Sequence, residues 1–342
     1  MVNIGIIGVG YWGINLVRNF YQCKGVRVHS VCDSDLKRKD YICKTYGRDI
    51  GFTVNYEDLL KNDDIDAIVI ATPAITHYKI AKDSLLSDKH VFVEKPLAMN
   101  ILESKELIDV SEERKTVLMV GHTFLYNAAV KKLKEYVNGN EFGQIYYIYS
   151  QRLNFGIVRQ DINAMWNFAP HDISIVLYLM GMDPIRVSAR GLSYLQKDIQ
   201  DVVFLNLDFS NKVSAYIHVS WLDYNKVRKM TIVGNKKMAV YDDADPVAKI
   251  KIYNQGNLRN DGSISFDKSK DLGGSQPARR LSDLFIPEIE YAEPLKVECS
   301  HFIESITKTR KPLSDGLNGL QVVRVLAAAQ RSLANGGIAV DL

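Results

Sequence analysis

The chain has 342 residues, enough for two domains, and its 46% hydrophobic and 24% charged residues are ordinary for a globular protein. Its formal net charge of +3 is too small to suggest nucleic acid or a membrane surface as a partner. No apolar run approaches the roughly 20 residues that span a bilayer, and the first residues lack the features of a signal peptide. The four cysteines include no C-x-x-C pair, so we expect no metal site, no structural disulfide and a reducing compartment such as the cytoplasm.

The first third of the sequence alternates short apolar runs with helical patterns. The runs are almost continuously apolar, as expected for parallel strands that are covered on both faces. We predict strands at residues 2–8, 26–32, 65–71, 90–93 and 117–120, and helices at 12–22, 76–86 and 102–113. This alternation predicts a doubly wound parallel sheet, that is, a Rossmann domain over residues 1–123.

After residue 123 the pattern changes to long alternating strands, which predicts a second α/β domain over residues 124–342 with a large open, mostly antiparallel sheet. Turn residues at 210–211 and 234–235 indicate hairpins within this sheet. The predicted strands are 143–154, 185–192, 201–209, 213–221, 228–233 and 238–242, and the predicted helices are 128–137, 171–180, 294–308 and 317–333. Residues 254–280 are rich in Gly, Ser, Asn and charge, and we expect a long loop there.

A glycine-rich motif, Gly8-Val9-Gly10-Tyr11-Trp12-Gly13, separates the first predicted strand from the first helix. In a dinucleotide site the first glycine permits the tight turn, the second lets the pyrophosphate approach the backbone, and the third lets the helix approach the strand. The N–H groups at the start of the helix would then face the phosphates. The alternative is a merely compact turn between strand and helix. We expect the loop, including Tyr11 and Trp12, to contact a dinucleotide.

Asp33 ends the second predicted strand, 20 residues after Gly13, where an acidic side chain accepts hydrogen bonds from the adenine ribose of NAD. A 2′-phosphate would be repelled there, so we expect NAD rather than NADP. Lys37 and Arg38 would soften that repulsion, and a solvated carboxylate is the alternative for Asp33. Ser34 is expected in the same ribose site.

The ends of the next strands supply further candidates, because the carboxyl ends of parallel strands face the ligand crevice. Thr72 and Pro73 follow the third strand, and His77 follows in the next helix, so all three are candidates for cofactor contact. For His77, a surface position in the first turn of that helix is an equal alternative. Glu94 and Lys95 end the fourth strand, and burying a lysine there is costly unless it is used or paired. A structural Glu94–Lys95 ion pair is the alternative to a catalytic lysine.

These motifs, taken in this order, resemble those of the Gfo/Idh/MocA oxidoreductase family, and the resemblance covers essentially the whole chain. It implies that Glu94 and Lys95 contact the cofactor and that Lys95 also lies at the reacting hydroxyl. Family members usually carry Asp-x-x-x-His at the start of the first long helix of the second domain. Here His171 matches, but Asn167 stands in place of the aspartate. The resemblance therefore implies Lys95 and His171 as the acid/base pair, without an Asp–His dyad.

The sequence around His171 supports a role in proton transfer. Pro170 suits the first position of a helix, which would place His171 in the first turn, where the helix dipole disfavours imidazolium. A neutral imidazole can accept a proton. A capping or packing role is the alternative for His171.

Arg152 and Arg159 suit an anionic substrate group such as a diphosphate, although surface solvation explains each arginine equally well. With Asn167 and His171 they form the predicted substrate set. The run from Arg159 to His171 is most similar to that of nucleotide-sugar 3-dehydrogenases, which implies NAD-linked oxidation at C3 of UDP-N-acetylglucosamine. A dehydrogenase or ketoreductase of another sugar, namely the uronate, a dTDP-ketosugar, inositol or a free sugar, is an alternative. A non-catalytic cofactor-sensing protein is another. Because the open sheet would expose an apolar face, we expect a homodimer or homotetramer.

Overall fold

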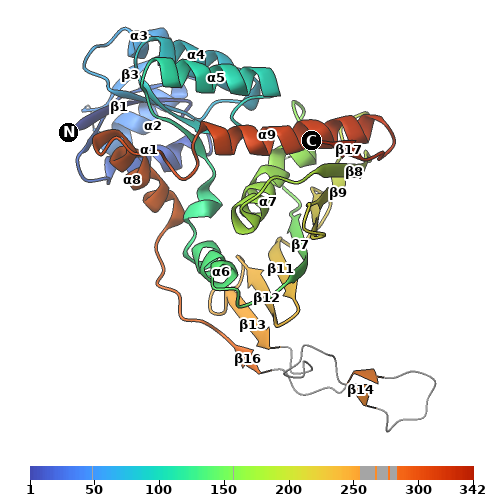
Figure 1. Ribbon diagram of the computed structural model, residues 1–342. Coiled ribbons are helices and arrows are strands. Elements are labelled where there is room, and N and C mark those ends of the chain that lie inside the picture. Colours follow the sequence, from blue (N-terminus) through green and yellow to red (C-terminus); the bar gives the residue numbers. More distant parts are fainter. Residues whose placement is uncertain (48, 157, 255–265, 268–275, 278–282) are drawn as a thin grey trace. The chain divides into compact units, whose positions relative to one another are not determined.

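The computed structural model describes residues 1–342 except 48, 157, 255–265, 268–275 and 278–282 (Figure 1). The chain divides into two compact units, Met1–Asn127 with Tyr291–Ala327, and Ala128–Glu290 with Ala328–Leu342. The segment Tyr291–Ala327 belongs with the first unit, whereas the sequence placed it in a second domain of residues 124–342. Among the described residues, no helix has both the length and the hydropathy needed to cross a membrane.

The described part of the first unit contains one sheet of six parallel strands in the order β3-β2-β1-β4-β5-β6. The strands are β1 (Val2–Ile7), β2 (Val26–Cys32), β3 (Gly51–Thr53), β4 (Ala67–Ile70), β5 (His90–Glu94) and β6 (Leu118–Gly121). The strand order reverses between β1 and β4, which is where open α/β sheets bind ligands. The predicted doubly wound parallel sheet is confirmed.

The helices of the first unit include several that the sequence pattern did not reveal, since α2 buries only Ile42 among its side chains and α3 is a single turn. They are α1 (Gly13–Tyr21), α2 (Lys37–Tyr46), α3 (Glu57–Leu60), α4 (His77–Leu86), α5 (Ile101–Glu113) and α8 (Pro294–Thr307), with short 3₁₀ turns η1 (Ala74–Thr76) and η2 (Thr123–Tyr126). Helix α9 (Gly316–Ala334) passes from the first unit into the second.

Helix α8 joins the first unit through an aromatic cluster. Phe20 of α1, Phe92 of β5 and Phe302 of α8 meet edge to face, with ring centroids 5.7–6.2 Å apart. Arg18 of α1 also forms a bidentate ion pair with Glu293, the residue directly before α8. The last part of the first unit is therefore held by packing and by charge against the first helix of the chain.

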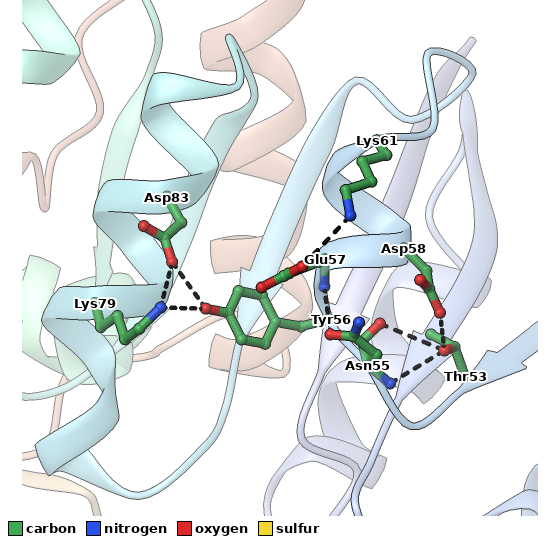
Figure 2. A network of polar contacts seen from close by, with 8 residues as sticks. All are labelled: Thr53, Asn55, Tyr56, Glu57, Asp58, Lys61, Lys79 and Asp83. Atoms are coloured by element: carbon green, nitrogen blue, oxygen red, sulfur yellow. Dashed lines mark hydrogen bonds and ion pairs between the residues drawn. The ribbon is translucent and has the colours of Figure 1, made fainter.

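A polar network ties the segment after β3 to α4 (Figure 2). The hydroxyl of Tyr56 donates to Asp83 at 2.7 Å, and the ammonium of Lys79 donates to both, at 2.7 and 2.8 Å. Thr53 and Asn55 organise the turn that leads into α3. These groups are mostly solvent-exposed, so they contribute modestly to stability, but they help to fix α4, which begins at His77.

The described part of the second unit contains a sheet of nine strands in the order β16-β13-β12-β11-β7-β10-β9-β8-β17. The strands are β7 (Ile145–Leu153), β8 (Arg186–Leu192), β9 (Val202–Asp208), β10 (Ser214–Ser220), β11 (Val227–Gly234), β12 (Lys237–Asp242), β13 (Ile250–Asn254), β16 (Leu284–Phe285) and β17 (Val340–Asp341). Only the pair β7–β10 is parallel among the described pairings, so the predicted mostly antiparallel sheet and both predicted hairpins are confirmed.

The second unit also contains α6 (Ala128–Asn138) and α7 (Ala164–Met180). Helix α7 packs on one face of the sheet (Figure 1). On this face the side chains of Ile148, Leu205 and Ile217 are buried. Most of the loop predicted at 254–280 lies outside the described residues, which show within it a short pair of strands, β14 (Phe266–Asp267) and β15 (Gln276–Pro277).

Candidate functional site

The glycine-rich loop after β1 has room for a ligand at one position only. Gly8 has a φ of +88°, and a β-carbon there would lie 2.7 Å from the carbonyl oxygen of Ala71. A β-carbon at Gly13 would lie 1.9 Å from the carbonyl oxygen of Gly8. At Gly10, by contrast, a β-carbon would meet nothing within 4 Å. The first and third glycines are thus required by packing, and the second leaves the backbone open for a close approach.

The start of α1 and the end of β2 complete a cradle around this loop. Helix α1 has no side-chain cap at its N-terminus, and the backbone N–H groups of Ile14 and Asn15 donate to the carbonyl oxygens of Gly10 and Trp12. The carboxylate of Asp33 accepts the backbone N–H of Val9 at 2.8 Å and that of Asp35 at 2.9 Å. Asp33 is half-buried, and Ser34 and Tyr11 are exposed. The uncapped start of α1 and the open backbone at Gly10 suit the phosphates of a dinucleotide. The carboxylate of Asp33 suits a ribose hydroxyl.

His77 does not lie at the surface, which was the alternative to cofactor contact in the sequence. Its ring is buried, with Nδ1 2.7 Å from the carbonyl oxygen of Pro96 and Nε2 2.9 Å from that of Thr72. The imidazole therefore joins the ends of β4 and β5, and a surface position is wrong for it. The hydroxyl of Thr72 accepts that of Thr76 at 2.7 Å, which shapes the same turn, with Pro73 between them. We conclude that His77 holds together the loops that follow β4 and β5.

Glu94 and Lys95 stand at the end of β5, next to the glycine-rich loop. Glu94 is buried, and one of its oxygens accepts the indole N–H of Trp12. Its other oxygen accepts the backbone N–H of Lys95 at 3.3 Å. Burial raises the pKa of Glu94 to about 7, although the charge of the half-buried Lys95 and the bond from Trp12 oppose the shift. One carboxyl group thus connects the loop that would hold the cofactor with the candidate catalytic lysine.

Sequence reasoning missed His122, which directly follows β6. The register of β5 and β6 pairs Glu94 with Gly121. Lys95 and His122, the next residue of each strand, therefore lie at corresponding positions beyond the two strand ends. His122 is buried, and its Nδ1 lies 2.7 Å from the amide oxygen of Asn318, so Nδ1 carries the proton. Burial, and to a lesser degree the charge of Lys95, lower the pKa of His122 to about 4. Its place at a strand end was the available signal.

Helix α7 of the second unit begins earlier than predicted. Asn163 caps it by accepting the backbone N–H of Trp166 at 3.1 Å, and the helix runs from Ala164 to Met180. Pro170 lies inside the helix, and His171 follows it two turns from the start. The predicted position of His171 in the first turn is wrong, and the dipole argument drawn from it fails. Asn167 lies nearer the helix start, and both side chains are half-buried.

Arg152 is committed to an ion pair. Its guanidinium donates to both oxygens of Asp172, at 2.6 and 3.3 Å, and both side chains are buried. Ser150 donates to the same carboxylate at 2.6 Å. The expectation that Arg152 faces an anionic substrate is therefore replaced by a role in fixing α7 beside His171. Arg159 donates to both oxygens of Asp161, at 2.8 and 2.6 Å, but remains about one third exposed.

Comparison with known proteins agrees with this geometry. Residues 2–122 match the GFO/IDH/MocA oxidoreductase family with its NAD-binding Rossmann fold, and residues 130–240 match the C-terminal domain of the same family. The chain is 25% identical over 343 residues to the oxidoreductase YrbE of Bacillus subtilis, covering 97% of this chain and 94% of that one. It is 27% identical over 267 residues to UDP-N-acetylglucosamine 3-dehydrogenase of Acidithiobacillus ferrooxidans, covering 78% and 77%.

Two solved structures share the fold. That of the Acidithiobacillus ferrooxidans enzyme has a TM-score of 0.81 at 23% identity and covers 97% of each chain. An oxidoreductase from Agrobacterium radiobacter, in complex with NAD⁺, L-tartaric acid and magnesium, has a TM-score of 0.81 at 17% identity and covers 99% of this chain and 98% of that one. The chain therefore belongs to the GFO/IDH/MocA oxidoreductase family, and its first unit is an NAD-binding Rossmann domain.

Proposed function

We propose that the protein oxidises a secondary hydroxyl of a nucleotide sugar with NAD⁺, and that the position oxidised is C3 of UDP-N-acetylglucosamine. The observation that carries the proposal is the cradle around Gly10 with Lys95 at the end of β5, on the same crevice edge of the sheet. The 27% identical UDP-N-acetylglucosamine 3-dehydrogenase supports the substrate. The similarity of the whole fold to that enzyme supports the same architecture.

The residues of the cradle would hold the cofactor. The backbone of Gly8, Gly10 and Gly13, flanked by Tyr11 and Trp12, would face the pyrophosphate, and Asp33 with Ser34 would bind the adenine ribose. Thr72 and Pro73 would line the nicotinamide half together with Glu94 and Lys95, and His77 would hold these loops in place. When bound, NAD⁺ supplies the hydride acceptor, and the protein supplies orientation and proton transfer.

Lys95 and His171 would perform the acid/base work. An amine or a neutral imidazole removes the hydroxyl proton as the carbon–hydrogen bond breaks, and it holds that proton for the reverse reaction. The positive charge of the oxidised cofactor would favour the neutral form of Lys95. Because Asn167 is not ionisable, it would serve as a hydrogen-bonding group to the sugar. Arg159 would meet the diphosphate, in competition with Asp161.

The experiment is a spectrophotometric assay of NADH formation with NAD⁺ and UDP-N-acetylglucosamine. We expect Lys95→Met to lose at least about a hundredfold in turnover while it still binds NAD⁺, since general acid–base catalysis is worth that much. Lys82→Met is the control, because Lys82 pairs with Glu106 on the outer helices α4 and α5. Unchanged turnover in Lys95→Met would reject the mechanism.

The same assay separates the alternatives. If the protein oxidises the uronate, another sugar or inositol but not UDP-N-acetylglucosamine, the proposed substrate is wrong and the proposed chemistry stands. Binding of NAD⁺ without turnover of any sugar in the panel would favour a cofactor-sensing protein.

The assembly would be a homodimer or homotetramer formed through the sheet of the second unit. The face of this sheet opposite to α7 carries aromatic side chains at adjacent positions of three strands. Tyr149 pairs with Tyr216 across β7 and β10, and Phe204 of β9 stacks on His218 with ring centroids 4.2 Å apart. Phe204 and Tyr216 are 53% and 46% exposed, which is costly for a face left in water. The four free cysteines suit the cytoplasm, where we place the protein.

A further inference from the structure

Two buried carboxyl groups lie together under the crevice of the first unit. Glu94 ends β5 and Glu298 belongs to α8, and both are buried, Glu298 completely. The carboxyl of Glu94 rests against the backbone of β6, 3.0 Å from where a β-carbon of Gly121 would be. Two residues further along, the hydroxyl of Thr123 donates to Oε2 of Glu298 at 2.7 Å. Glu298 is thus attached to the same strand end that Glu94 covers.

The surroundings of Glu298 contain little to stabilise a negative charge. Its Oε1 atom is buried and has no hydrogen-bonding partner among the described residues. Among the described residues, the charged group that acts on Glu298 is the carboxyl of Glu94. Further out, Cys299 is affected by Glu298, Glu94, Glu293 and Cys23, and Tyr126 by Glu298 and Asp315. The cation coupled to Cys299 is Arg18, which is paired with Glu293. Lys95 acts on Glu94 and on the neutral His122. A carboxylate in such a place loses its hydration without gaining a counter-charge.

We propose that Glu298 is a positioning residue that remains a neutral carboxylic acid while the enzyme works, so that the pair carries a single negative charge, located on Glu94. Glu94 is the better place for this charge, because it accepts the N–H of the Trp12 indole and the backbone N–H of Lys95. Burial and the charge of Glu94 both raise the pKa of Glu298 well above its ordinary value, in agreement with this assignment.

A neutral Glu298 would matter for both partners of Glu94. A second negative charge would repel the carboxylate of Glu94, and so displace it from the Trp12 indole or favour its protonated form. It would also hold Lys95 in its ammonium form, which cannot accept a proton. The effect on Lys95 rests on the proposed function, whereas the effect on the loop rests only on NAD binding. The loop should therefore lose NAD⁺ at high pH as Glu298 ionises.

The first test is infrared spectroscopy of the carboxylic acid carbonyl band in the intact protein. At about pH 8 exposed carboxyl groups are ionised, so a remaining band reports a buried acid. We expect this band in the unaltered protein, its loss in Glu298→Gln, and its retention in Glu304→Gln, which changes an exposed glutamate of the same helix. In Glu94→Gln the band should disappear at a lower pH than in the unaltered protein, because the opposing charge is gone. A band that is absent at about pH 8 from the unaltered protein, or that survives in Glu298→Gln, would overturn the proposal.

The second test measures NAD⁺ affinity against pH by calorimetry, with the fluorescence change at Trp12 as a cross-check that should vanish in Trp12→Phe. Glutamine imitates the neutral acid, so Glu298→Gln should match the unaltered protein near neutral pH. At high pH the unaltered protein should bind about tenfold more weakly than Glu298→Gln, the worth of a hydrogen bond to a charged group. Identical pH profiles would contradict the proposal. If the infrared and affinity results hold while no sugar is oxidised, the proposed function fails and the assignment of Glu298 stands.

Discussion

At the scale of single residues, the buried pair of Arg152 and Asp172 gives the sharpest expectation for stability. Arg152→Met removes one charge and leaves the buried carboxylate of Asp172 with Ser150 as its remaining side-chain hydrogen-bond donor among the described residues. We expect the free energy of unfolding to fall by about 3–5 kcal/mol, measured by denaturant titration. The matched control is Arg159→Met, which breaks the partly exposed pair with Asp161 and should cost less than about 1 kcal/mol. Equal losses in the two variants would show that burial does not decide the effect.

A second prediction for a single residue concerns His122 and the pH dependence of the free energy of unfolding. Its pKa is lowered to about 4 in the folded protein, so the unfolded chain takes up a proton at a higher pH than the folded one. The sign follows from this difference: the neutral ring costs nothing above its ordinary pKa, and stability falls as the pH drops from about 6.5 toward 4, by up to about 3 kcal/mol. His122→Gln cannot protonate and should flatten this part of the profile. An unchanged slope would assign it to other groups.

The residue scale also shows what the sequence could not decide. Gly8 and Gly13 show the tight turn and the close approach of helix to strand that their spacing predicts, and Gly10 leaves its backbone open, because a backbone turn is a local property. For Arg152 and His77 the sequence leaves ligand contact and surface exposure open, and the internal partners of both are not among its alternatives, since a side chain that is committed to an internal partner looks the same in sequence as an available one. The partner of Arg152 is 20 residues away, and the pairing depends on which face of the strand α7 covers.

At the scale of elements, the start of α7 shows how two signals compete. Pro170 resembles a first helical residue, but Asn163 is also a good cap, and the structure uses Asn163. Burial of Ala164, Met165 and Trp166 stabilises the longer helix. This stabilisation comes from tertiary packing, which the sequence pattern does not reveal. The short β3 and the polar α2 were missed for a related reason, because they bury too little to leave a periodic pattern.

The caps of α7 and α5 provide a matched prediction. Asn100 caps α5 through a single bond to the N–H of Glu103, so Asn100→Ala should cost about 1 kcal/mol of stability. Asn163 caps α7 and also donates its amide to Gln200 and Gln330, at 2.9 and 3.2 Å. Asn163→Ala should therefore cost more, about 2–3 kcal/mol, because it also removes the two amide hydrogen bonds to the half-buried Gln200 and Gln330. Thermal unfolding of both variants measures the difference, and equal shifts would mean that the cap alone counts.

At the scale of the whole molecule, the proposed assembly can be tested on the sheet of the second unit. Phe204→Asp combined with Tyr216→Asp places charges on the aromatic face, and we expect the oligomer to dissociate to monomers in light scattering. Both side chains are exposed within one chain, so the fold should persist. Tyr224→Asp is the control, since Tyr224 is exposed in the loop after β10. A monomeric unaltered protein would contradict the assembly directly.

The two-domain pattern was readable from sequence because periodicity changes after residue 123, but the placement of Tyr291–Ala327 was not. Helix α8 shows a helical pattern that predicts its existence and not its partner. The partner is decided by Phe302 against Phe20 and by Glu293 against Arg18, contacts that span most of the chain. Such pairings depend on the assembled core, and no local pattern encodes them.

These same contacts have a consequence for the order of events during synthesis. A ribosome delivers β1 to β6 early, but the segment that covers Phe20 and Phe92 emerges only after Glu290, when Ala128–Glu290 of the second unit has already been made. Until then the nascent cofactor domain exposes an apolar surface that chaperones would recognise. Ribosome-bound chains stalled before residue 291 should therefore be cut readily by protease in their first 127 residues, and released full-length protein should resist.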